Sequence, residues 1–205
     1  RLTRMRRASF AQNEISRVEG LEACVQLEEL NLEDNRLVTI EGLQTLSALR
    51  KLDLGKNRIT RLENLSPHLS SLSQLSLEDN GVTSLRGLAG LHSLMELYVG
   101  NNKISETREV QHLKTLPKLI ILDMVGNPAC DLPDYRHYVV YYLRRVKVLD
   151  GVGVEASDLS AAKSKYAGRL TREHLEEKIG RRFFNNVRVL DLSAARIREI
   201  GDVFT

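Results

Sequence analysis

The sequence has no tryptophan, only two cysteines and four prolines, and aromatic residues make up 5% of its 205 positions. Cys24 and Cys130 are too few and too far apart to staple a small secreted domain, which favours a reducing compartment and two buried thiols. No run of about 18 uncharged apolar residues occurs, so we expect no membrane-spanning helix. The chain opens on Arg1 without a leader pattern, and we expect it to be a piece of a longer protein.

Signatures of catalysis are also missing. The five histidines fall in five different stretches and show no metal-ligand spacing. Glycine-rich phosphate loops and the G-x-S-x-G nucleophile motif do not occur. We therefore predict a non-enzymatic chain with no catalytic, cofactor-binding or metal-binding residues, no cofactor and no small-molecule substrate.

The net charge of +3 conceals a segregation along the chain. Residues 21–135 carry 11 basic and 16 acidic side chains, whereas residues 136–188 carry 12 basic and 6 acidic ones. A basic segment of this kind can contact nucleic acid, an acidic lipid face or an acidic protein. The simpler interpretation, a solvated helical surface, is the one we favour.

What the sequence does have is an internal repeat. Asparagines recur at spacings of 22, 22, 23, 22 and 25 residues, at Asn13, Asn35, Asn57, Asn80, Asn102 and Asn127. Apolar residues stand five and three positions before each of them, as in Leu30 and Leu32, although the first unit has Ala8 and Phe10. This alternation predicts a short strand with one buried face, and successive units stack such strands into a parallel sheet. The asparagine amide satisfies backbone groups in the turn.

The repeat has a recognisable end. After Asn127 and Pro128 the period fails, residues 135–143 carry apolar side chains at helical spacing, and residues 146–151 read as a short strand and turn. A stack of repeats needs such a cap because its last core layer would otherwise face water. We interpret the cap's tyrosines as packing residues rather than a binding site: Tyr135, Tyr138, Tyr141 and Tyr142.

The 22-residue L-x-x-L-x-L-x-x-N-x-I unit, closed by N-P…Y-R…V-x-x-L-D-G, resembles a leucine-rich-repeat family. Its typical members are the nuclear regulatory subunit of protein phosphatase 1, the axonemal dynein leucine-rich light chain and the spliceosomal U2 A-prime protein. The similarity covers residues 1–151. It implies an α/β leucine-rich-repeat solenoid with a parallel concave sheet. It also implies a non-enzymatic protein-binding module located inside the cell, in the cytoplasm, the nucleus or the cilium and axoneme.

The remaining chain predicts a different organisation. We expect a helical connector over residues 152–186 and the truncated start of a second repeat array over residues 187–205, where Ala195 stands in place of the asparagine. A single repeat cannot hold itself together, so this array is expected to continue beyond Thr205. Several arrays joined by helical connectors resemble the large leucine-rich-repeat-containing protein nine type, which is found with ciliated cells.

The strand positions that point away from the core are the candidate functional surface. Eight of them are acidic and three basic, which predicts a negative concave face with one aromatic residue and an apolar end at Ile121 and Val125. Such a face would steer a basic protein or helix and anchor it on the tyrosine. The predicted partner-binding residues are Glu29, Glu33, Asp34, Asp53, Glu78, Asp79, Glu96, Tyr98 and Asp123.

Three alternatives remain open. The first alternative, which the resemblance allows, is that the chain is a regulatory subunit of a phosphatase or motor catalytic domain. It binds nucleic acid, which we rank lower because no aromatic stacking platform is interleaved with its basic residues; these are Arg144, Arg145, Lys147, Lys163, Lys165, Arg169, Arg181 and Arg182. Open repeat edges at residues 5–10 and 187–192 also predict self-association of the isolated fragment.

Overall fold

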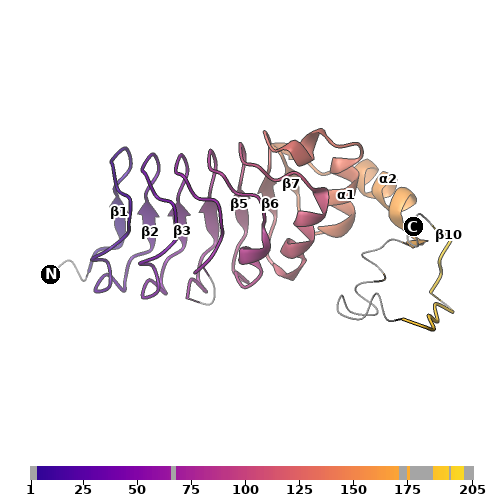
Figure 1. The fold of residues 1–205 in the computed structure, drawn as a ribbon, viewed down its shortest axis with the longest axis horizontal. Helices are drawn as coiled ribbons and strands as arrows, with labels where there is room; N and C mark the ends of the chain where they lie inside the picture. The colour runs from indigo at the N-terminus through magenta and orange to yellow at the C-terminus, as the bar shows by residue number, and fades with distance from the viewer. Residues whose placement is uncertain (1–3, 66–67, 171–174, 176–186, 194, 201–205) are drawn as a thin grey trace.

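The computed structural model describes residues 4–65, 68–170, 175, 187–193 and 195–200. They contain an eight-stranded sheet whose strands follow chain order, with β1 to β7 parallel and β8 antiparallel to β7 (Figure 1). The strands are β1 (Arg7–Ser9), β2 (Glu29–Asn31), β3 (Lys51–Asp53), β4 (Gln74–Ser76), β5 (Glu96–Tyr98), β6 (Ile121–Asp123), β7 (Val148–Leu149) and β8 (Val152–Gly153). The predicted leucine-rich-repeat solenoid with a parallel sheet is confirmed.

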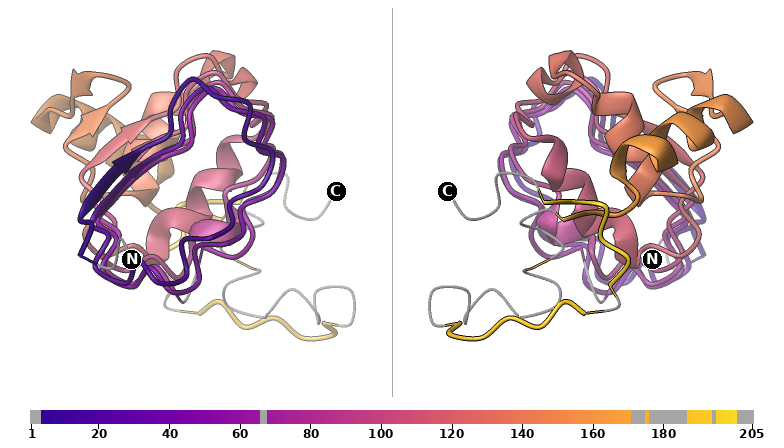
Figure 2. Two further views of the ribbon diagram at one scale, coloured as in Figure 1. Left: turned by 90° about the vertical axis from the view of Figure 1, so that its left-hand side faces the viewer. Right: turned by 90° about the vertical axis from the view of Figure 1, so that its right-hand side faces the viewer.

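Each strand from β1 to β6 consists of three residues at the same positions of the repeat, so neighbouring strands pair residue for residue. The middle residue of each strand from β2 to β6 is a leucine that is no more than 2% exposed. The two flanking residues point to the opposite face, as the two-residue period of a strand requires. Figure 2 looks along the stack, where the units superimpose as a ring around this leucine-filled core.

Each interior asparagine joins its own unit to the preceding one. Asn102 Nδ2 donates to the carbonyl oxygen of Leu77 in the unit before, at 2.9 Å, and to those of Val99 and Gly100 in its own unit, at 3.0 Å. Its Oδ1 accepts a hydrogen bond from the backbone N–H of Val82 at 2.9 Å. The same four bonds recur at three further asparagines: Asn35, Asn57 and Asn80.

The return side of the units is made of turns and short 3₁₀ helices, η1 (Arg86–Leu88), η2 (Thr107–Thr115) and η3 (Pro128–Asp131). Neighbouring units approach closely here: a Cβ atom built on Gly87 would lie 1.5 Å from the carbonyl oxygen of Leu62. The sheet therefore lines one side of the array, and the return segments line the other.

The cap consists of α1 (Tyr135–Tyr142), β7 and β8, and α2 (Ala156–Tyr166) follows it. The α2 helix starts at a capping box, in which the Asp158 side chain accepts a hydrogen bond from the backbone N–H of Glu155 at 3.0 Å. Two ion pairs hold α2 against α1: Arg136 with Asp158, at 2.7 Å between Nη2 and Oδ2, and Lys165 with Asp134. In Figure 2, α2 lies outside the ring of stacked units.

The described part of the C-terminal segment forms a parallel pair, β9 (Arg169–Leu170) with β10 (Glu199–Ile200). The repeat pattern places a strand near residues 190–192, yet the structure has none in the described residues 187–193. The apolar positions of that unit, Leu190, Leu192 and Ile197, are only partly buried and pack on a small separate cluster of Leu170 and Leu175. Residues 171–186 of the predicted helical connector lie outside the described residues except Leu175, and the three-part domain division stays a prediction.

Candidate functional site

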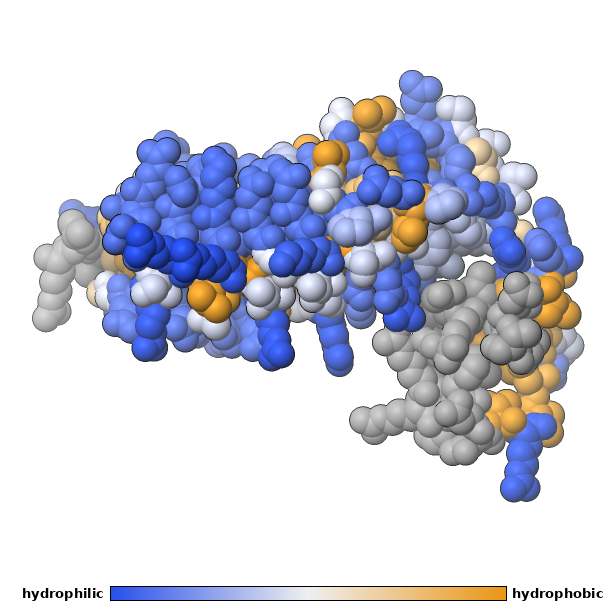
Figure 3. All heavy atoms as spheres, turned by 45° about the horizontal axis from the view of Figure 1, so that its top comes forward, coloured by the Kyte–Doolittle hydropathy of each residue, from blue (hydrophilic) through white to orange (hydrophobic). Residues whose placement is uncertain are grey.

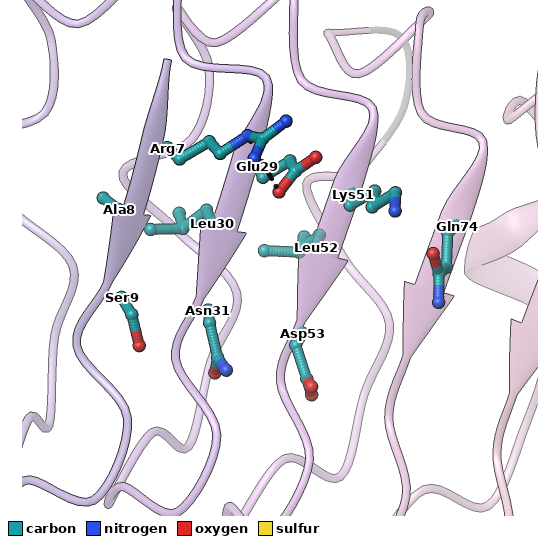
Figure 4. Close-up of a pocket in the computed structure, with 10 residues that line it drawn as sticks. All are labelled: Arg7, Ala8, Ser9, Glu29, Leu30, Asn31, Lys51, Leu52, Asp53 and Gln74. Atoms are coloured by element: carbon teal, nitrogen blue, oxygen red, sulfur yellow. Dashed lines mark ion pairs between the residues drawn. The ribbon is translucent and has the colours of Figure 1, made fainter. Parts of the chain in front are cut away.

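The outward face of the sheet carries side chains in straight rows. One row runs through the first residues of the strands, which Figure 4 shows for β1 to β4, and another runs through the third residues, which it shows for β1 to β3. Leu30 and Leu52 between these rows belong to the core. The surface chemistry of the face is therefore set by the rows, and the two ends of the sheet differ in it.

The N-terminal half of the face is balanced in charge. Arg7 pairs with Glu29, at 3.4 Å between Nε and Oε2, and Lys56 pairs with Glu33, at 2.7 Å between Nζ and Oε1. Lys51 adds a further cation to the hollow of about 390 Å³ that extends from β1 to the first residue of β4. Of the predicted acidic residues, Glu29 and Glu33 are thus already neutralised within the chain.

The C-terminal half of the face, over β4 to β6, carries uncompensated acids. Within the described residues no ion pair involves Glu78, Glu96 or Asp123. Partial burial raises the pKa of Glu78, and the nearby charges of Asp123, Asp79 and Asp53 raise that pKa further. Like charges that resist ionisation together mark a site where an external cation is stabilised.

Gly100 forms the floor between two of these carboxylates. A Cβ atom built on it would lie 3.6 Å from Glu78 Oε1 and 3.7 Å from Asp123 Oδ1. The absent side chain leaves the carboxylates facing one another across open backbone. Gly100 and its counterpart Gly55 stand at the same position of the repeat, but the repeat pattern alone predicts no role for either.

Tyr98 lies next to this acid pair on β5. Its hydroxyl donates to Glu96 Oε2 at 3.0 Å, and its ring is half-buried between the neighbouring strands. Burial raises the pKa of Tyr98, and the bond to Glu96 adds to the rise, so the hydroxyl stays protonated at neutral pH. Ile121 and the 52%-exposed Val125 extend an apolar surface from there towards the cap.

Two predicted residues differ from the others in backbone conformation. Asp34 and Asp79 occupy left-handed turns after their strands, with φ of 56° and 53°. Both side chains are exposed, and the charge of Asp79 contributes to the raised pKa of Glu78. The structure brings the other acids and Tyr98 together on one sheet face, and their role in partner binding stays a prediction.

The basic segment splits into two groups. Lys165 and Arg169 pair with Asp134 and Glu199, so they hold the chain's own elements together. Arg144 and Arg145 instead stand at the end of α1, with Lys147 following, while Lys163 is exposed on α2. Arg181 and Arg182 lie outside the described residues.

Two tyrosines of the cap lie against cations, which the sequence did not predict. The Arg144 guanidinium lies 5.6 Å from the centre of the Tyr141 ring, and Lys114 Nζ lies 4.5 Å from that of Tyr142. The contact of Lys114 with Tyr142 joins side chains that are distant in sequence, so linear spacing did not reveal it, whereas Arg144 follows Tyr141 by one helical turn. The cap tyrosines also pack on one another and on Tyr166.

Other kinds of site were also sought. Among the described residues no group of three or more histidine, cysteine, aspartate or glutamate side chains is placed to hold a metal ion. No helix in this part of the chain has the length and apolar character to cross a membrane.

Comparison with known proteins agrees with this geometry. A family model described as "Leucine Rich repeats (2 copies)" matches residues 25–67 and 47–90, and one described as "Leucine-rich repeat" matches residues 86–180. The chain is a leucine-rich repeat protein. Proteins built of leucine-rich repeats are generally non-enzymatic interaction scaffolds, and their fold is typical of protein–protein binding.

Solved structures share the fold at low sequence identity. A chain of the Drosophila melanogaster SNF/U2A′ complex is 23% identical, with a TM-score of 0.55, over 84% of this chain and 86% of that one. An internalin (InlF) of Listeria monocytogenes is 20% identical, with a TM-score of 0.59, over 75% of this chain and 49% of the other. A Leptospira interrogans leucine-rich repeat protein is 24% identical, with a TM-score of 0.51, over 62% and 38%.

Proposed function

We propose that this leucine-rich repeat protein binds a basic segment of another protein on the C-terminal half of its concave face. The observation that carries the proposal is the pair Glu78 and Asp123, which face one another over Gly100 without an intramolecular cation. In the N-terminal half, Glu29 and Glu33 already form ion pairs with Arg7 and Lys56. An incoming lysine or arginine therefore gains most over β4 to β6.

The same region supplies an apolar anchor. Tyr98 presents a half-buried ring beside the acids, and Val125 exposes half of its surface at the next row. Tyrosines at the centre of interfaces often carry much of the binding energy. A partner that suits this surface carries arginine or lysine next to an aliphatic or aromatic side chain, as one face of an amphipathic helix does.

The sheet also lowers the entropic cost of binding. Its strands are joined through backbone pairing and through the asparagine bonds, so the rows of side chains hold their positions before a partner arrives. Binding to such a surface loses little conformational entropy. A bound cation also stabilises the ionised form of Glu78, so association near the raised pKa of this residue releases a proton.

A charge-reversal experiment tests the proposal. Glu78→Lys with Glu96→Lys changes the uncompensated half, and Glu29→Lys with Glu33→Lys changes the paired half by the same net charge. Affinity capture from cell lysate with mass spectrometry, run for both variants and the parent chain, measures which partners remain. We expect the first variant to lose basic partners and the second to retain them.

Two further measurements make the outcome decisive. Circular dichroism shows that each variant keeps the fold, and Glu22→Lys with Glu63→Lys on the return side serves as a control for net charge alone. If all three variants lose the same partners, global charge governs capture. If none does, partners bind elsewhere, and the concave-face proposal is wrong.

Finer assignments also remain proposals. The family resemblance supports a regulatory role towards a phosphatase or motor catalytic domain, and a location in the cytoplasm, the nucleus or the cilium. The same capture experiment identifies such a catalytic domain among the partners. Localisation of a tagged full-length protein by microscopy tests the compartment.

A further inference from the structure

A second candidate surface lies at the cap, away from the acidic face. It is a shallow hollow of about 360 Å³ between the end of η2 and the end of α1. Apolar side chains line its base, among them Leu113, Pro117 and Leu143, and cations surround it. This volume falls at the lower end of the roughly 300–1,000 Å³ typical of binding pockets.

The cations around this basic hollow are held in fixed positions. Lys114 lies over the Tyr142 ring and Arg144 over the Tyr141 ring, and these two rings are themselves in contact, with centres 5.1 Å apart. Arg145 donates from Nη1 to the carbonyl oxygen of Pro117. Cations placed in this way lose little side-chain freedom when an anion binds.

The two arginines of the basic hollow have no carboxylate partner in the described part of the chain. Among the same residues, the neighbouring Lys118 and Lys147 form no ion pair with a carboxylate either. Lys165 and Arg169, by contrast, are used within the fold. Among the described residues of the basic segment, Arg144, Arg145 and Lys147 thus stand without a carboxylate partner at or next to the hollow.

We propose that the basic hollow binds an acidic segment of a protein partner, with an aliphatic side chain in the hollow and carboxylates on the surrounding cations. Charge complementarity selects an anionic partner. The apolar base selects a peptide, because a leucine side chain fills it whereas a phosphate backbone leaves it empty. Nucleic acid bases need free aromatic faces, and here Tyr141 and Tyr142 each already carry a cation.

A defined peptide tests this directly. The probe is a fluorescein-labelled peptide in which two leucines are flanked by glutamates and aspartates, titrated with the 205-residue chain in fluorescence anisotropy at low and moderate salt. Arg144→Glu with Arg145→Glu is the test variant. Arg58→Glu with Lys103→Glu, two exposed cations on the array, is the control with the same charge change.

We expect the affinity for the peptide to fall at least tenfold in the test variant and less than twofold in the control variant. Replacing the leucines of the peptide by serines should weaken binding at least threefold, and replacing its acids by their amides should abolish it. Thermal unfolding followed by circular dichroism shows whether each variant is folded. If Arg144→Glu with Arg145→Glu lowers the melting temperature, Arg144→Gln with Arg145→Gln replaces it.

Several results would overturn the proposal. Equal affinity for the test and control variants means that the hollow is not the site. Equal affinity for the leucine and serine peptides means that charge alone attracts the probe. Tighter binding of single-stranded RNA, or of phosphatidylserine vesicles, that is lost in the same test variant assigns the surface to another class of partner.

Discussion

The repeat array and the cap are stabilised in different ways. In the array, one pattern of asparagine hydrogen bonds recurs from unit to unit, and the core is a column of leucines. In the cap, each interaction occurs once: the ion pairs of Arg136 and Lys165 and the tyrosine cluster. The stability of the array is distributed over many equivalent hydrogen bonds. In the cap, loss of one ion pair removes a large part of the contact between α1 and α2.

The largest expected effect distinguishes an interior asparagine from the first one. Asn102→Ala leaves the buried N–H of Val82 without its acceptor and removes one of the donors to each of three carbonyl groups, which we expect to cost about 3 kcal/mol of unfolding free energy. The Asn13 side chain is exposed, with two bonds to its own unit, and Asn13→Ala should cost about 0.5 kcal/mol. Urea unfolding measures both, and equal losses would contradict a role in joining units.

A smaller effect is expected in the cap. Arg136→Ala removes the bonds from Nε and Nη2 to Asp158 and the bond to the carbonyl oxygen of Gly153, and should cost about 1 kcal/mol. Hydrogen exchange should show the loss in α2 and leave the strands β2 to β5 protected. Arg61→Ala removes an exposed pair with Glu63 and serves as the control. Uniform deprotection of array and cap would contradict their independence.

Acid should loosen the same contact. The Arg136 guanidinium and the capping bond lower the pKa of Asp158 from 3.8 to about 2. A lowered folded-state pKa contributes stability above the ordinary value, and that stability is lost as the pH falls from about 4 towards 2. Exchange in α2 should therefore rise over this range before the array unfolds. Asp158→Asn should remove this pH dependence, and an unchanged pH profile would contradict the assignment.

The smallest effect concerns the concave face. Because the pKa of Glu78 is raised, its ionised form is disfavoured in the fold, and Glu78→Gln should increase stability at pH 7 by a few tenths of a kcal/mol. The same change should weaken binding of a basic partner. Glu63→Gln, which removes a paired and exposed acid, is not expected to stabilise. A destabilised Glu78→Gln chain would show that the acid serves the fold.

The array could be predicted well from the sequence because every unit repeats the same spacing of leucines and asparagine. Leu52, Leu75 and Leu97 could be placed on adjacent strands before any coordinate was known. The cap was predicted as a type, without its contacts. The pairing of Lys165 with Asp134 joins two segments that occur once, and no period relates them.

The candidate site was predicted in part for the same reason. The repeat placed Glu78, Asp123 and Tyr98 on one face, but it could not show that Lys56 would neutralise Glu33. The pairing depends on the conformations that the lysine and glutamate side chains adopt between neighbouring units. The basic hollow depends on Lys114 meeting Tyr142 across the cap, which linear spacing does not encode.

The number of paired strands sets the length of the concave face. Seven parallel strands, each about 4.8 Å from the next, give a face roughly 30 Å long, about the span of a 20-residue helix. Since Asn102 reaches back only as far as the preceding unit, inserting or deleting one unit leaves every other junction intact. The length of the binding face can therefore change in steps of one strand, by duplication or deletion of about 22 codons, to match a longer or shorter partner.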